Sequence, residues 1–119
     1  MTQRILVVDD EPEFGTYVGE VARGLGYEVE ITTSADAFMQ AYDKFDPSIV
    51  MLDVVMPDID GIELLKWLSE RECTAKIIVV TGYNPSYASM ATTLGGKQGL
   101  NTLNAKKPIS VQDLRELIG

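Results

Sequence analysis

Several apolar runs of this chain end in residues that can bind a metal ion or a phosphoryl group. These residues are Asp9, Asp10, Asp53, Thr81 and Lys107. Carboxylates that share one pocket raise one another's pKa unless a cation is present, so a group of three predicts a divalent ion. The chain has no histidine, and with carboxylate donors the expected ion is Mg²⁺, with Mn²⁺ as a substitute. A carboxylate beside Mg²⁺ can attack phosphorus, while a lysine and a hydroxyl bind the phosphoryl oxygens.

Buried parallel strands would bring these residues together. Apolar runs rich in Val and Ile are typical of strands that are covered on both faces. The runs are Ile5–Val8, Ile49–Leu52 and Ile77–Val80, with a weaker segment around Leu103. Residues just past the carboxyl ends of parallel strands meet at one edge of the sheet, where open α/β folds bind ligands. We therefore expect three carboxylates, a hydroxyl and an amine at that edge.

The segments between these runs predict an alternation of strands and helices. Residues 28–32 alternate as in a strand with one wet face. Helical spacing of apolar residues predicts helices over residues 12–25, 34–42, 60–68, 84–94 and 110–119. The second and fifth strands are mixed in polarity and suit the sheet edges, so right-handed crossovers give the order 2-1-3-4-5. The expected fold is α/β and flavodoxin-like, a (βα)5 three-layer sandwich forming one domain over residues 1–119.

Composition excludes several other classes of protein. With a net charge of -8, the chain would repel nucleic acid and anionic membranes. No apolar stretch approaches the roughly 20 residues of a membrane span, and no signal peptide precedes Arg4, so a cytoplasmic location is expected. Cys73 is the single cysteine, which excludes an internal disulfide and a cysteine-based zinc site. The lack of histidine excludes Ser-His-Asp hydrolysis.

Four motifs, in this order along the chain, resemble the receiver domain of two-component response regulators. They are VVDDEP at residues 7–12, LDVVMPDIDG at 52–61, VTG at 80–82 and KP at 107–108. The resemblance covers nearly the whole chain. It implies that Asp53 accepts a phosphoryl group from the phosphohistidine of a sensor histidine kinase or a histidine phosphotransfer protein. It also implies a signalling domain that modifies its own aspartate, and not an enzyme that turns over a separate substrate.

The resemblance further implies a role for each residue of the site. Thr81 and Lys107 would bind the phosphoryl group, with help from the backbone amides of Val54 and Gly82. The bond from Lys107 to Pro108 resembles one that is cis in the family, although cis is the minority isomer of X–Pro bonds in general.

For the metal, the resemblance implies a Mg²⁺ ion with mixed ligands. Asp10 and Asp53 would bind it together with the backbone carbonyl of Val55, and Asp9 would act partly through water. These assignments agree with the three carboxylates that the strand pattern gathers at one edge.

Three residues are expected to set the output and the lifetime of the phosphorylated state. Asn104 stands where the family usually has an aromatic switch residue, so we expect intact phosphorylation chemistry with an atypical output. Val55 and Tyr83 flank the route of water to the acyl phosphate and offer no strong base. We therefore expect slow autodephosphorylation.

Other interpretations of the same residues stay open. Asp9 or Asp10 could cap the first helix. A haloacid-dehalogenase-like phosphatase also uses an aspartate after an apolar strand with Mg²⁺, and a receiver-fold interaction module would work without phosphate. A downstream partner or an attached effector is expected for a receiver, as is a homodimer linked to phosphorylation.

Overall fold

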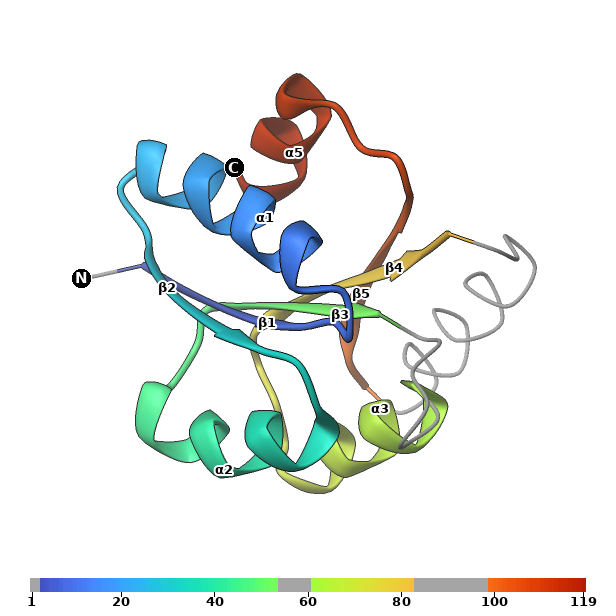
Figure 1. The fold of residues 1–119 in the computed structure, drawn as a ribbon. Helices are drawn as coiled ribbons and strands as arrows, with labels where there is room; N and C mark the ends of the chain where they lie inside the picture. The colour runs from blue at the N-terminus through green and yellow to red at the C-terminus, as the bar shows by residue number, and fades with distance from the viewer. Residues whose placement is uncertain (1–2, 54–60, 83–98) are drawn as a thin grey trace.

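A parallel sheet with helices on both faces forms the molecule (Figure 1). The computed structural model describes residues 3–53, 61–82 and 99–119. Its strands are β1 (Arg4–Val8), β2 (Glu28–Thr32), β3 (Ile49–Asp53), β4 (Lys76–Thr81) and β5 (Asn101–Lys106). Its helices are α1 (Pro12–Gly24), α2 (Ala35–Phe45), α3 (Gly61–Glu70) and α5 (Val111–Ile118). All neighbouring strands pair in parallel in the order β2-β1-β3-β4-β5, which confirms the predicted sheet.

The helices form two layers around the sheet, as predicted for a three-layer sandwich. Among the described residues, α1 and α5 cover one face, and α2 and α3 cover the other (Figure 1). Alternate strand residues point to opposite faces, so Leu6 and Leu52 pack with α2 and α3 while Ile5 and Met51 pack with α1 and α5. Full burial of such a side chain stabilises the fold by about 1.5–3 kcal/mol. The core therefore fixes the central strands and, with them, the positions of their carboxyl ends.

Helix ends follow the expected capping residues, with one difference. The side chains of Ser34 and Ser110 accept hydrogen bonds from the backbone N–H groups of the first helical turn, each at 3.1 Å. The first helix ends at Gly24, so Leu25 does not belong to its buried stripe and is 38 % exposed. The chain turns away here because Gly26 adopts a positive φ of 91°, a conformation that glycine tolerates.

Two of the predicted features concern residues that the structure does not describe. The helix predicted over residues 84–94 and the expected N-cap Asp60 lie outside the described residues. None of the helices that the structure describes is both long enough and apolar enough to cross a membrane.

Candidate functional site

The carboxyl ends of β1, β3 and β4 place three of the predicted residues at one edge of the sheet. Asp9 follows β1 directly, and Asp53 and Thr81 are the last residues of β3 and β4. All three are buried, with exposures of 2 %, 5 % and 1 %. Because Val8 of β1 is paired with Leu52 of β3, Asp9 and Asp53 end neighbouring strands at the same level. A buried carboxylate destabilises the fold unless it is paired or binds a cation, so both residues need partners.

Glu11 joins the predicted carboxylates in one group, which we call the acidic cluster. Single oxygens of Asp9, Asp10, Glu11 and Asp53 all lie within 4.8 Å of one another. Asp9 Oδ1 accepts a hydrogen bond from the Glu11 backbone N–H at 2.8 Å. Asp9 Oδ2 is buried, and its partner in the described part of the chain is a cation, the ammonium of Lys107, at 2.7 Å. Several carboxylates gathered in this way, with two of them buried, suit a hard cation that prefers oxygen ligands, such as Mg²⁺.

The structure also decides the capping alternative for the aspartate pair. The N-cap of α1 is Glu11, so neither Asp9 nor Asp10 caps this helix. Asp9 lies two residues and Asp10 one residue before the N-cap, and Asp9 instead accepts a hydrogen bond from the backbone N–H of Glu11.

Lys107 directly follows β5, and its side chain contacts the acidic cluster. Its backbone N–H donates to Thr81 O at 2.9 Å, which continues the strand pairing. Its Nζ lies 2.7 Å from Asp9 Oδ2, 3.0 Å from Glu11 Oε1 and 3.6 Å from Asp53 Oδ2. Burial lowers the pKa of Lys107, but the contacts with Asp9 and Glu11 outweigh it and hold the pKa above its usual range. The ammonium group therefore stays charged beside the carboxylates.

Two further residues border the Lys107 side chain. The ring of Phe14 lies 4.4 Å from Nζ, measured to the ring centroid, which is a cation–π distance. A Cβ placed on Gly82 would lie 3.7 Å from Lys107 Cδ, so this predicted residue runs alongside the lysine. The sequence did not predict the roles of Phe14 and Glu11 beside Lys107. Phe14 also packs against the core, as expected for an apolar residue of this helix.

Of the remaining predicted site residues, the structure describes Pro108 but not the three residues that follow Asp53 and Gly82. The peptide bond between Lys107 and Pro108 is cis, in line with the family resemblance. Val54, Val55 and Tyr83 lie outside the described residues, and their roles stay predictions.

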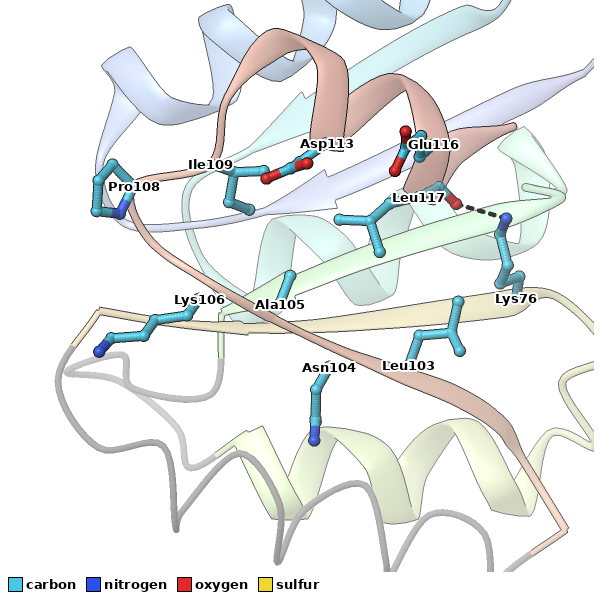
Figure 2. A pocket seen from close by; sticks show the side chains of 10 residues that line it. All are labelled: Lys76, Leu103, Asn104, Ala105, Lys106, Pro108, Ile109, Asp113, Glu116 and Leu117. Carbon is cyan, nitrogen blue, oxygen red and sulfur yellow. Dashed lines mark hydrogen bonds between the residues drawn. The ribbon is translucent and has the colours of Figure 1, made fainter.

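Asn104 lines a pocket that lies apart from the acidic cluster. It is exposed on β5, beside Val79 of β4. Figure 2 shows the pocket of about 380 Å³ between β5 and α5 that it lines. The other lining residues are Lys76, Leu103, Ala105, Lys106, Pro108, Ile109, Asp113, Glu116 and Leu117. No member of the acidic cluster lines this pocket, so the expected switch position and the charged site occupy different parts of the molecule.

Comparison with known proteins decides the family. The model of the response regulator receiver domain matches residues 5–119. The chain belongs to this family. The receiver is 33 % identical over 116 residues to the chemotaxis protein CheY of Halobacterium salinarum, covering 95 % of this chain and 93 % of that protein. The family is that of response regulators in two-component signalling, so the residues gathered at the sheet edge lie in a signalling domain.

Comparison with solved structures also gives a receiver domain. One relative in sequence, in contrast, is much longer than this chain. A CheY-like receiver domain protein from Methanospirillum hungatei superposes with a TM-score of 0.85 at 28 % identity, covering 99 % of this receiver and 91 % of that chain. The transcriptional regulatory protein TrcR of Mycobacterium tuberculosis is 27 % identical over 111 residues, which are 93 % of this receiver but only 42 % of TrcR. The receiver thus spans less than half of that relative.

Proposed function

We propose that this receiver accepts a phosphoryl group on Asp53 in a Mg²⁺-dependent reaction. The observation that carries the proposal is the approach of Lys107 Nζ to within 3.6 Å of Asp53 Oδ2, inside the acidic cluster. A phosphoryl group attached to Asp53 would place negatively charged oxygens near the same ammonium, and charge-assisted contacts of this kind are strong. The neighbouring Thr81 is buried at the carboxyl end of β4, and its hydroxyl would bind the phosphoryl group from the same edge of the sheet.

The proposed transfer forms one bond and breaks one. A carboxylate oxygen of Asp53 attacks phosphorus, and the bond from phosphorus to the imidazole nitrogen of a donor phosphohistidine breaks. The imidazole leaves with the electron pair and takes up a proton from water. Lys107 binds phosphoryl oxygens as a point charge, and Thr81 and the Gly82 backbone amide donate hydrogen bonds to them. Attack of water on phosphorus later returns the free carboxylate and inorganic phosphate.

The acidic cluster supplies the proposed metal ligands. Asp9, Asp10 and Asp53 would hold Mg²⁺, and the bound ion offsets the negative charge of the incoming phosphoryl oxygens. Asp10 is exposed, which leaves space for the waters that Mg²⁺ usually retains. The donor set supports this assignment, because single oxygens of these carboxylates lie within 4.8 Å of one another.

The proposed partners follow from the chemistry and from Asn104. The donor would be a sensor histidine kinase or a histidine phosphotransfer protein, and residues 1–119 would act as one phosphoacceptor domain in the cytoplasm. The phosphorylated domain would control a partner protein or an attached effector, including through a homodimer. A small polar Asn104 cannot bury and expose an aromatic surface, which supports an atypical output. Slow hydrolysis remains the expectation from Val55 and Tyr83.

Incubation with acetyl phosphate and Mg²⁺ tests the function. The intact mass should increase by one phosphoryl group per chain, and Asp53→Asn should take no label. Asp113→Asn, an exposed carboxylate on α5, is the matched control and should label like the wild type. Label retained in Asp53→Asn would overturn the proposal. Continuous release of phosphate from a phosphate monoester would favour the phosphatase alternative instead.

A further inference from the structure

Glu11 occupies the N-cap position of α1 without capping the helix. Its backbone is extended, and its side chain accepts no hydrogen bond from the first turn. Ser, Thr, Asp and Asn are the residues that normally fill this position, because their short side chains reach the free N–H groups. The Glu11 carboxylate contacts Lys107 instead, with Oε1 3.0 Å from Nζ. A position that usually stabilises a helix is here occupied by an ion-pair partner of the site lysine.

This ion pair holds the ammonium group on one side of the site. Nζ is within hydrogen-bond distance of Asp9 Oδ2 and Glu11 Oε1, at 2.7 and 3.0 Å, but lies 3.6 Å from Asp53 Oδ2, beyond that distance. The Phe14 ring contacts the same ammonium. Asp9 would share its charge with a bound cation, whereas the Glu11 side chain is 55 % exposed and is not among the proposed metal ligands.

We propose that Glu11 is a positioning residue that, together with Asp9, holds the Lys107 ammonium just beyond hydrogen-bond distance of Asp53 in the unphosphorylated receiver and thereby slows phosphoryl transfer. The inference rests on the proposed function of Asp53. For Lys107 to bind the phosphoryl oxygens, its ammonium must exchange Glu11 for the phosphoryl group. The ion pair then stabilises the ground state but not the transition state, and its loss speeds the transfer.

Two substitutions test whether Glu11 slows the transfer by its contact with Lys107 or only by repelling an anionic phosphate donor. Glu11→Gln removes the charge, whereas Glu11→Asp keeps the charge, shortens the side chain and suits the N-cap, where it accepts from a first-turn N–H. Both remove the contact of Glu11 with Lys107 and leave the contact with Asp9 in place. At saturating Mg²⁺, both should raise the rate constant of labelling by acetyl phosphate about two- to fivefold, the range expected for a partly exposed ion pair. Glu11→Asp should also raise the melting temperature through its added cap.

Glu13→Gln provides the matched control. It makes the same charge change two residues later, in the first turn of α1, at an exposed residue with no ion pair in the part of the chain that the structure describes. Its labelling rate should equal that of the wild type. As a second readout, the affinity for beryllofluoride should rise in both Glu11 variants by a factor similar to that of the rate.

The possible results distinguish this inference from the proposed function. A wild type that labels at Asp53, together with a Glu11→Asp rate that is unchanged or lower, would overturn the inference and leave the proposed function intact. Acceleration in Glu11→Gln alone would mean that Glu11 only repels the donor, which also overturns it. A wild type that takes no label would overturn both.

Discussion

The acidic cluster and the pocket between β5 and α5 differ in how their charged groups are paired. At the carboxyl edge of the sheet, one ammonium contacts three carboxylates and the pairs are largely buried. In the pocket between β5 and α5, the side chains of Lys106, Asp113 and Glu116 form no ion pair with any described residue. Buried charges depend on their partners, whereas exposed charges are solvated individually. The charged groups of the first region therefore hold one another in place, whereas those of the second are solvated one by one.

The largest expected difference between the regions concerns two adjacent lysines. In the absence of Mg²⁺, Lys107→Ala should lower the free energy of unfolding by about 3 kcal/mol, because it leaves the buried Asp9 without its cation. Lys106→Ala, at the exposed neighbour, should change it by less than about 0.5 kcal/mol. Urea denaturation of both variants gives the comparison. Equal losses in the two variants would show that the acidic cluster does not depend on Lys107.

Mg²⁺ should stabilise the protein through the acidic cluster and not through the pocket. We expect this effect to be somewhat smaller than that of Lys107→Ala. The ion should raise the melting temperature of the wild type, equivalent to about 1–3 kcal/mol at high concentration, because it relieves repulsion among the carboxylates and binds the folded state. Asp10→Ala should remove most of this increase, while Asp113→Ala, in the pocket, should retain it. Thermal melts with and without a chelator measure both. A wild-type melting temperature that ignores Mg²⁺ would contradict the proposed metal site.

The sequence predicted the framework of the site better than its details. Apolar runs ending in Asp9, Asp53 and Thr81 were enough to place these residues at one edge, because burial on both faces leaves few alternatives to a central parallel strand. The contact between Glu11 and Lys107 could not be predicted, since it depends on a rotamer at a helix start and joins residues far apart in the chain. Leu25 shows the same limit, because periodicity cannot tell a last helical residue from a C-cap.

The smallest expected effects concern α5. Tyrosine side chains form hydrogen bonds with its last residue and with a residue just before its start. Tyr17 Oη donates to Ile109 O at 2.7 Å, and Tyr27 Oη donates to Ile118 O at 3.1 Å. We therefore expect beryllofluoride to leave the amide hydrogen exchange of α5 nearly unchanged. Tyr27→Phe removes one hydrogen bond worth about 1 kcal/mol and should speed exchange at the end of α5 about fivefold. A large change in the amide exchange of α5 on adding beryllofluoride would contradict our expectation that phosphorylation leaves this helix unchanged.

A phosphoryl group on Asp53 can be located by chemical reduction. After labelling with acetyl phosphate and Mg²⁺, borohydride reduces an aspartyl phosphate to homoserine, which tandem mass spectrometry assigns to a position in the chain. We expect homoserine at position 53 alone, and none when Mg²⁺ is chelated. Homoserine at position 9 or 10, or a stable phosphate on a hydroxyl side chain, would contradict it.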